Sequence, residues 1–429
     1  MRLLFLAPQP FFMERGTPIA VRLALQVLAN RKSAPTEPSS NRSPHQENID
    51  KIDLLTYHEG AEVEIENVNI HRISAPRLLN GVGPGISVKK ILCDILFLLK
   101  TIKMVWSQRH AQYDLVHAVE ESVFVALLLR AFVGIPYIYD MDSSLAMQVT
   151  EKWYVLRPLR PVLEWFERLA VRHSTAVVPV CDALAVIAER HGSKETHILR
   201  DVSLLKDSHR TDAVSLRKEI GVAEDTKLIV YIGNLETYQG IDLLLDAFAA
   251  AASLDSGSHV VIIGGSEHHI QKYRAKAQQL GLSDRIHLIG PRPLKELDNY
   301  ILQADILTSP RIKGNNTPMK IYSYLHSGKP ILATNLPTHS QVMDRRVAEM
   351  SHVEPQAFAD GLLRLLEDEG YCKQLGAAAK ALAEREYTFS VFAKKLNQIY
   401  DRVGQRIELT PQIAPVSYTH LRAHETNVD

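Results

Sequence analysis

Residues 309–334, SPRIKGNNTPMKIYSYLHSGKPILAT, combine residue types that suit the binding of an anion. A Gly/Asn loop follows a predicted strand, and a helix is predicted to begin at Thr317–Pro318, which places Lys320 in its first turn. A cation there opposes the helix dipole at a cost of about 0.3–1 kcal/mol. With Arg311 and Lys313 in the same loop, the pattern predicts a phosphate site. The alternative is a solvated Lys320 that only snorkels over the surface.

A second loop of this kind follows the first predicted strand. Gly16 precedes Thr17 and Pro18, and an apolar helical pattern comes next. Thr17 suits the N-cap of that helix and Pro18 its first position. A glycine at a helix N-terminus lets backbone N–H groups approach an anion, although the motif also fits a capped helix with no ligand.

Polar side chains also follow two predicted strands of the N-terminal half. His117 ends one strand, with Glu120 and Glu121 just beyond, and Asp140 and Asp142 end another. Because such strand ends meet at one edge of a parallel sheet, they predict a rim that faces substrate. Asp142 and His117 are the candidate catalytic residues on this rim. Alternatively, Asp142 and the next serine cap a helix, and His117 is a satisfied core histidine.

Residues 88–106, VKKILCDILFLLKTIKMVW, form a basic amphipathic stretch in which four lysines interrupt a dense apolar run. Such a helix can lie in the interface of an anionic bilayer, so a peripheral membrane contact is one expectation. The other is a core-packed helix whose lysines point outward.

The rest of the chain alternates short apolar runs with helical patterns, which predicts parallel sheets covered on both faces. The pattern restarts after about residue 205, so the fold class is α/β, with two Rossmann-like doubly wound domains that face each other across a cleft. Ligands of such sheets bind beyond the carboxyl ends of the strands. The predicted strands are Leu3–Ala7, Ile52–Thr56, Asn69–Arg72, Leu115–Ala118, Tyr137–Asp140, Ala176–Val180, Leu228–Gly233, Val260–Gly264, Ile286–Ile289, Ile306–Ser309 and Ile331–Thr334.

These patterns divide the chain into four parts. The N-terminal Rossmann-like domain is expected to span 1–205, with a flexible insertion at 31–52 that is too polar to order itself. The C-terminal Rossmann-like domain spans 206–385, and a helix at 386–404 crosses back to the first domain. The tail 405–429 is expected to be disordered, and its SYTHLRAHET stretch resembles translated adapter sequence that is not native.

Composition excludes several classes of protein. Lys plus Arg and Asp plus Glu number 49 each in 429 residues, which argues against a general nucleic-acid binder. Three widely spaced cysteines argue against a disulfide scaffold or structural zinc. No signal peptide or membrane span is predicted, so the expected location is cytoplasmic, with a peripheral contact at the inner face of the membrane as a further expectation.

The segment 309–334 resembles the donor-site signature of family 4 glycosyltransferases, which have the GT-B fold. The stretch YIGNLETYQGIDLLLDAFAAA (231–251) resembles that family's Gly-Arg-Leu-x-x-x-Lys-Gly element, and the Gly16 loop resembles its glycine loop. The resemblance implies a nucleotide-diphosphate sugar as donor and co-substrate, transfer with retention of configuration, and neither a metal nor a further cofactor. The implied acceptor is a cell-envelope, polysaccharide or lipid-linked glycan.

The implied donor-binding residues combine both loops with the Lys320 helix. They are Gly16, Thr17, Gly233, Asn234, Gln239, Arg311, Asn316, Thr317, Pro318, Lys320, Ile321 and Ser323.

The sequence departs from the family at four positions. Asn234 and Gln239 replace the usual Arg and Lys, and each lost charge-assisted hydrogen bond could cost about 1.5–3 kcal/mol. Ser323 stands where a glutamate would accept from the ribose hydroxyls, and a second expected glutamate aligns near Asn315. A divergent subgroup, an altered donor or lost activity could follow. The coherent Gly-Asn-Asn-Thr-Pro-x-Lys loop favours an active divergent subgroup; the alternative is an inactive nucleotide-sugar-binding scaffold.

Overall fold

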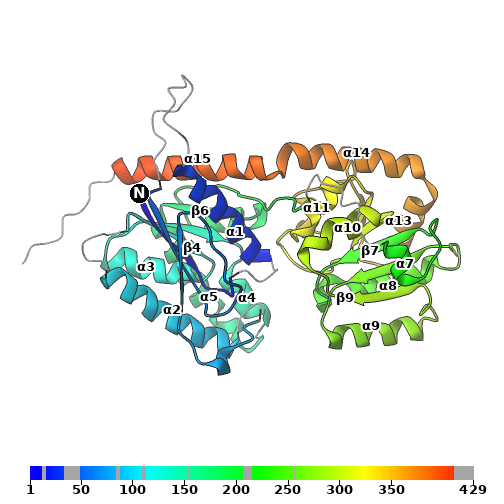
Figure 1. The fold of residues 1–429 in the computed structure, drawn as a ribbon, viewed down its shortest axis with the longest axis horizontal. Coiled ribbons are helices and arrows are strands. Elements are labelled where there is room, and N and C mark those ends of the chain that lie inside the picture. The colour runs from blue at the N-terminus through cyan, green and yellow to red at the C-terminus, as the bar shows by residue number, and fades with distance from the viewer. Residues whose placement is uncertain are drawn as a thin grey trace, which may run out of the picture.

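The computed structural model describes residues 1–11, 16–32, 49–83, 87–107, 113–152, 154–205, 215–255 and 257–409. Two parallel six-stranded sheets lie side by side along the molecule (Figure 1). The first sheet has the order β3-β2-β1-β4-β5-β6 and the second the order β12-β11-β10-β7-β8-β9. The α/β fold class with two doubly wound sheets is therefore confirmed.

Five of the six strands of the first sheet are almost fully buried, as expected for apolar parallel strands covered on both faces, and the edge strand Val68–Arg72 is only partly buried. Helices α2 (Val88–Ser107), α3 (Ser122–Phe132), α5 (Arg160–His173) and α6 (Asp182–Arg190) cover one face, and α1 (Gly16–Ala29) and α15 (Phe389–Leu409) cover the other. A short helix, α4 (Leu145–Lys152), follows the fifth strand. The strands are β1 (Arg2–Ala7), β2 (Lys51–Thr56), β3 (Val68–Arg72), β4 (Leu115–Val119), β5 (Tyr137–Met141) and β6 (Ala176–Pro179).

The second sheet repeats this plan. Helices α10 (Leu297–Gln303), α11 (Lys320–Ser327) and α14 (Glu369–Glu386) pack on one face, and α8 (Ile241–Ala251), α9 (Glu267–Gln279) and α13 (Pro355–Glu367) pack on the other. Two short helices, α7 (Leu216–Ile220) and α12 (Pro337–Ser340), complete it. The strands are β7 (Leu228–Ile232), β8 (His259–Ile263), β9 (Ile286–Gly290), β10 (Ile306–Ser309), β11 (Ile331–Thr334) and β12 (Glu349–Ser351). The last of these was not predicted, because three residues carry no readable period.

The C-terminal helices connect the two halves. Helix α14 lies against the second sheet, and α15 runs back along the first sheet beside α1 (Figure 1). The predicted crossover helix at 386–404 thus exists, but it begins at Phe389 and continues to Leu409. It extends into the predicted tail because Ile407 packs against the first core and Arg406 pairs with Glu195 at 2.7 Å. Residues 410–429 lie outside the described part of the chain.

The range 31–52 predicted for the flexible insertion includes ordered residues at both ends. Arg31 is buried and its guanidinium donates to Asp401 Oδ1 at 2.6 Å, while Lys51 already belongs to β2. The centre of the insertion, 33–48, lies outside the described residues, as do 206–214 at the expected domain boundary.

Candidate functional site

A cavity of about 640 Å³ lies between the two sheets, beyond the carboxyl ends of strands in the second sheet. Loops after β7, β8, β9 and β10 form most of its wall, and the N-terminus of α11 closes one side. Gly16 and Ile19 of α1, together with Leu204 of the connecting segment, complete the wall from the first half. The site thus lies where ligands of parallel sheets are expected.

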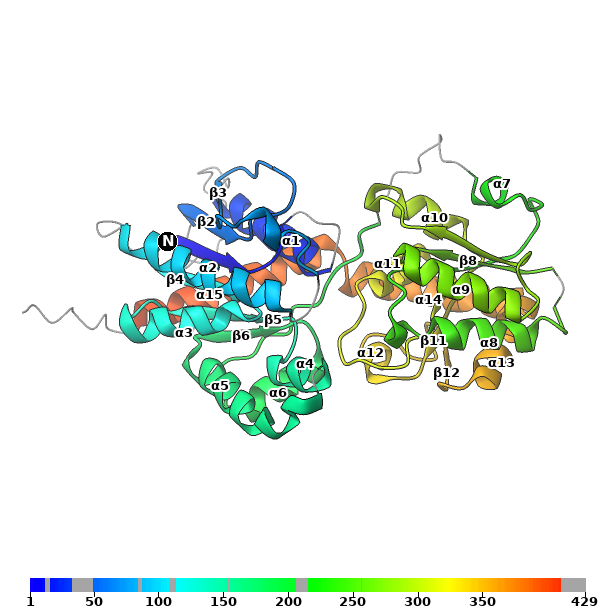
Figure 2. The ribbon, with the colours of Figure 1, turned by 90° about the horizontal axis from the view of Figure 1, so that it is seen from below.

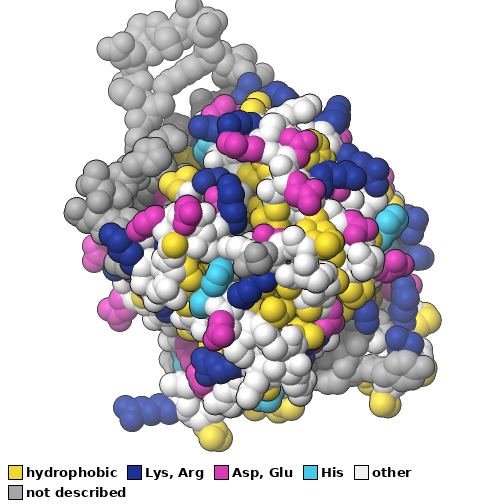
Figure 3. All heavy atoms as spheres, turned by 90° about the vertical axis from the view of Figure 1, so that its right-hand side faces the viewer, with side chains coloured by type: hydrophobic (Ala, Val, Ile, Leu, Met, Phe, Trp, Pro, Cys, Tyr) yellow, Lys and Arg dark blue, Asp and Glu magenta, His cyan; other side chains and the backbone are white. Residues whose placement is uncertain are grey.

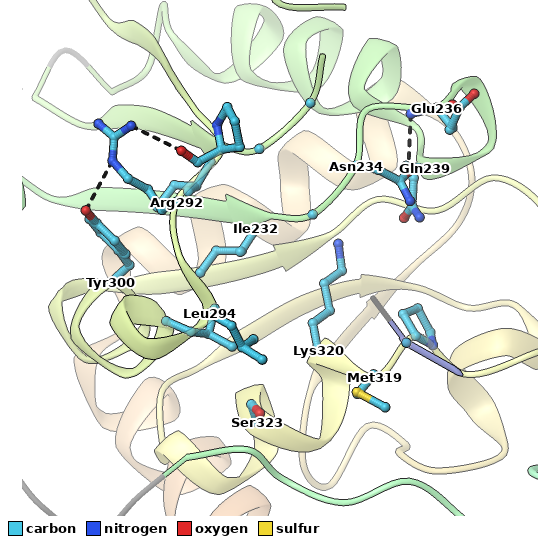
Figure 4. A pocket seen from close by; sticks show the side chains of 18 of the residues that line it. Ile232, Asn234, Glu236, Gln239, Arg292, Leu294, Tyr300, Met319, Lys320 and Ser323 are labelled. Carbon is cyan, nitrogen blue, oxygen red and sulfur yellow. Dashed lines mark hydrogen bonds between the residues drawn. The ribbon is translucent and has the colours of Figure 1, made fainter. Parts of the chain in front are cut away.

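Lys320 is the first residue of α11, and its ammonium group points into the cavity (Figure 4). The Nζ atom is buried, without a hydrogen-bond partner among the described residues, and lies 3.7 Å from the ring centroid of Tyr231. Burial, reinforced by repulsion from Arg311, holds the pKa of Lys320 well below its usual range. A buried cation without a hydrogen-bond partner is costly, so this side chain suits the binding of an anion.

Arg311 supplies a second cation at the same wall. Its Nη1 atom donates to the backbone oxygen of Asn316 at 2.6 Å and to Thr338 Oγ1 at 2.7 Å, and its guanidinium lies over the ring of Tyr238. The Nε atom is buried without a described hydrogen-bond partner, and burial lowers the pKa of the group. The Nη1 atom of Arg311 therefore stabilises the loop, and its Nε atom remains available to a ligand.

Two glycines that the sequence analysis overlooked shape the cavity floor. A Cβ on Gly264 would lie 2.1 Å from the backbone oxygen of Gly233, and a Cβ on Gly265 would lie 2.5 Å from a methyl carbon of Leu235. Both glycines have positive φ, 121° and 86°. Only glycine fits these positions without displacing neighbours. A Gly-Gly pair at the end of the predicted strand Val260–Gly264 was the available signal.

The segment after β9 was also missed. Arg292 donates to the backbone oxygen of Ile289 at 2.6 Å. It also donates to the Tyr300 hydroxyl at 3.2 Å (Figure 4). These bonds fix the loop that brings Leu294 to the cavity, opposite Ile232. The result is an apolar slot at this end of the cavity.

The predicted donor-binding residues divide into two groups. Those that line the cavity are Gly16, Gly233, Asn234, Gln239, Arg311, Pro318, Lys320 and Ser323. Gln239 is buried and its Oε1 atom has no described hydrogen-bond partner, whereas Ser323 Oγ already accepts from the backbone N–H of Leu204 at 3.0 Å. The four that do not line it are Thr17, Asn316, Thr317 and Ile321.

Three of those four instead hold the structure together. Ile321 is fully buried in the core, and Thr317 Oγ1 accepts from Gln341 at 3.0 Å. The amide of Asn316 donates to the backbone oxygen of Asp142. The Gly/Asn loop therefore joins the two halves of the molecule rather than contacting the cavity with these side chains.

Two predicted helix starts are shifted. Helix α11 begins at Lys320, two residues beyond Pro318, because Gly314 (φ 123°) and the contacts of the Gly/Asn loop keep the preceding residues out of the helix. Helix α1 begins at Gly16, so Thr17 lies inside its first turn and is not the N-cap. The Thr17 hydroxyl instead donates to the carboxyl group of Asp142.

Four carboxyl groups of the first half lie close enough to interact, although none of them lines the cavity: Glu120, Asp140, Asp142 and Asp201. Burial, then repulsion from Asp140 and Glu120, raises the pKa of Asp142 well above its usual range, and its bond with Thr17 opposes the rise. Burial and Asp140 together raise the pKa of Asp201 to about 7. Glu120, whose φ is 50°, also has a raised pKa, chiefly through burial. This acidic cluster thus retains protons that isolated carboxyl groups would lose.

Asp142 does not cap the following helix. Helix α4 begins at Leu145, and Ser144 Oγ accepts from the backbone N–H of Met147 at 3.4 Å. Buried Glu167 anchors this turn by accepting from Ser144 Oγ at 2.9 Å. The capping alternative proposed for Asp142 is therefore wrong. Its carboxyl group accepts a hydrogen bond from Thr17 instead.

His117 lies in the middle of β4, not at its end, and is almost fully buried. Its Nδ1 atom lies 2.9 Å from the Tyr400 hydroxyl and its Nε2 atom 3.2 Å from Asp140 Oδ2, while Phe5 stacks on the ring at 4.2 Å. Both ring nitrogens are occupied within the core. The structure places His117 as a satisfied core histidine beneath the acidic cluster, and not on the rim.

Among the described residues, no three His, Cys, Asp or Glu side chains are grouped as metal ligands would be.

Two family models match the two halves of the chain. The model described as "Glycosyl transferase 4-like domain" matches residues 46–200, and the one described as "Glycosyl transferases group 1" matches residues 213–382. A D-inositol 3-phosphate glycosyltransferase of Corynebacterium diphtheriae is 25% identical, over 80% of this chain and 82% of its own length. A phosphatidyl-myo-inositol mannosyltransferase of Mycobacterium leprae is 26% identical, over 42% of this chain and 47% of its own length.

Solved structures share the architecture. Sucrose-phosphate synthase of Thermosynechococcus elongatus superposes with a TM-score of 0.72 at 16% identity, covering 94% of this chain and 99% of that one. HepE of Anabaena, solved with UDP and glucose, gives a TM-score of 0.70 at 16% identity, covering 94% and 100%. With glycosyltransferase models matching both halves and this two-sheet architecture, the chain is identified as a glycosyltransferase of the GT-B fold.

Proposed function

We propose that this enzyme takes a sugar from a nucleotide-diphosphate sugar and transfers it, with retention of configuration and without a metal ion, to a cell-envelope, polysaccharide or lipid-linked acceptor. The observation that carries the proposal is the unpaired ammonium group of Lys320, buried in the wall of a cavity large enough for such a donor. A buried cation without a partner is stabilised most by a multivalent anion, and a diphosphate is the anion of this donor.

The cavity suggests how the donor lies. The diphosphate would occupy the space between Lys320, Arg311 and the glycine floor, where backbone N–H groups and the α11 N-terminus favour negative charge. The slot beside Ile232 and Leu294 suits a flat base, and Ser323 is placed for a ribose hydroxyl. HepE structures with UDP and UDP-glucose, although similar only in fold, support a uridine nucleotide as the first probe.

The chemistry follows from this placement. The bond between the anomeric carbon and the diphosphate oxygen breaks, and the acceptor oxygen bonds to that carbon on the same face of the sugar. The acceptor hydroxyl releases its proton to the departing diphosphate. Lys320 and Arg311 would stabilise the charge that develops on the diphosphate, in the role that a metal ion has in other transferases.

The acidic cluster is the proposed acceptor side. Carboxyl groups accept hydrogen bonds from sugar or polyol hydroxyls, and Asp142 is oriented by its bond with Thr17. The curated relatives, named for inositol phosphate and phosphatidyl-myo-inositol, support an acceptor rich in hydroxyl groups that is either phosphorylated or lipid-linked.

A panel of UDP, GDP and ADP sugars tests the proposal, with release of the nucleoside diphosphate as readout and cell extract as a source of acceptors. We expect release from one donor class in the presence of extract. Tight donor binding without release would favour the inactive scaffold, and the absence of both binding and release would contradict the donor assignment.

A further inference from the structure

Helix α2 presents apolar side chains on two opposite faces. Cys93, Phe97, Thr101 and Met104 are buried against the first sheet. A second stripe, offset by two residues, consists of exposed Ile91, Ile95, Leu99, Ile102 and Trp106. At 100° per residue, a two-residue offset places the stripes about 200° apart, so the second stripe points directly away from the sheet.

Helix α5 repeats this arrangement. Glu167 and Val171 are buried, whereas Val162, Trp165 and Phe166 on the opposite side are about half exposed. The rings of Trp165 and Phe166 lie edge to face, 4.9 Å apart. The preceding turn, Tyr154–Leu159, adds exposed Val155 and Leu159.

The two helices belong to the same side of the molecule. Together with α3, they cover the face of the first sheet that lies opposite α1 and α15 (Figure 2). Helix α3 contributes Phe132, which is 84% exposed. Most of the large exposed apolar side chains among the described residues lie on these elements. This set, on α2, α3, the 154–159 turn and α5, is called the apolar face below.

The apolar face is also basic in a chain with no net charge. Helix α2 carries four lysines and one aspartate. Lys90 pairs with Glu121 and is largely buried, which leaves Lys89, Lys100 and Lys103 to contribute positive charge at the surface. The turn and α5 together carry four arginines and two glutamates, one of which, Glu167, is buried. The end of the molecule formed by the C-terminal half, by contrast, shows Lys/Arg and Asp/Glu interspersed (Figure 3). Positive charge that borders exposed aromatic and aliphatic side chains matches the composition of interfacial helices.

We propose that the apolar face is a docking surface for an anionic lipid bilayer. Helix α2 would lie flat, because its inner stripe is already packed on the sheet, and its outer stripe would enter the boundary between headgroups and acyl chains. None of the described helices is long and apolar enough to cross a membrane. A second copy of this chain fits less well, because a symmetric contact would bring lysines against lysines. The inference does not rest on the proposed transfer reaction.

Flotation with phosphatidylcholine vesicles, with and without about one third phosphatidylglycerol, tests the proposal. We expect the full chain to float with the anionic vesicles at low salt, to bind neutral vesicles much less, and to lose binding as salt rises. The failure of the wild-type chain to bind anionic vesicles at low salt would overturn the proposal.

Matched substitutions locate the contact. Leu99→Asp and Trp165→Asp should each weaken vesicle partitioning about tenfold or more. Leu254→Asp is the control, because Leu254 is 76% exposed but follows α8 in the other half, and it should leave partitioning unchanged. UDP affinity should be the same in all three variants, which separates membrane docking from donor binding. Equal losses in all three, or a wild-type dimer that Leu99→Asp dissociates, would contradict a bilayer contact.

Discussion

The two sides of the cleft carry opposite charges, and each charge is incompletely compensated. On the second-half side, Lys320 and Arg311 have buried nitrogens without described partners. On the first-half side, burial and then repulsion from Asp140 raise the pKa values of Glu120, Asp142 and Asp201. The cationic side suits the leaving diphosphate and the acidic side suits acceptor hydroxyls. The difference teaches that the two sides suit ligands of different kinds, because buried polar groups without partners are costly and gain most from a complementary ligand.

The largest expected effect is on the cationic side. Lys320→Met should lower kcat/KM by about 100- to 1000-fold, because one preorganised group that stabilises the leaving charge is lost. Initial rates of nucleoside diphosphate release measure this. Lys313→Met, in the same loop but exposed, is the control and should change kcat/KM less than about twofold. Equal losses of kcat/KM in both variants would mean that the net positive charge of the loop matters, and not the position of Lys320.

The acidic side should affect turnover but not donor affinity. Asp142→Asn preserves shape but removes an ionisable group, and we expect kcat to fall by about 10- to 100-fold with UDP affinity unchanged and a melting temperature no lower than that of wild type. Steady-state rates, calorimetric titration with UDP and a thermal melt measure these three quantities. A parallel fall in UDP affinity would mean that Asp142 also contributes to donor binding, which would contradict the separation of the two sides.

His117 should affect stability and not turnover. His117→Phe removes contacts to Tyr400 and Asp140, and we expect a loss of about 1–3 kcal/mol in the free energy of unfolding. Denaturant titration measures the loss. A large fall in kcat without a change in stability would restore His117 as a catalytic candidate.

The smallest effect concerns pH. Asp201 has a pKa of about 7 in the folded chain and an ordinary value of 3.8, so between these values the folded state binds more protons than the unfolded state. Stability contributed by this group therefore falls as pH rises from 4 to 7. We expect Asp201→Asn to raise the melting temperature at pH 8 relative to wild type by about 2–4 °C, with a smaller difference at pH 5. A difference that is the same at both pH values would contradict the raised pKa.

Strands and the Lys320 segment could be predicted because their signals are local. Continuous apolar runs marked eleven strands, and the Thr-Pro start placed Lys320 in the first turn of its helix. What the sequence could not reveal depends on distant contacts. His117 is a core residue because Tyr400, 283 positions away, meets it. Asp201 joins the acidic cluster from a connecting segment that has no periodicity.

The same distinction explains the errors in the donor loop. Asn316 was expected to face the donor, but it bonds to the backbone of Asp142 across the cleft, a contact between segments that the sequence analysis treated separately. Gly264 and Gly265 had a local signal that was overlooked, because a Gly-Gly pair also fits an ordinary turn.

Calorimetric titration of UDP at pH 8, in two buffers with different ionisation enthalpies, tests the central claim most directly. Burial lowers the pKa of Lys320 in the empty cavity, and a bound diphosphate would raise it again. The account predicts net proton uptake on binding by the wild-type chain, and weaker binding without that uptake by Lys320→Met. Equal affinity and equal proton uptake in the two proteins would contradict the assignment of Lys320 to the diphosphate.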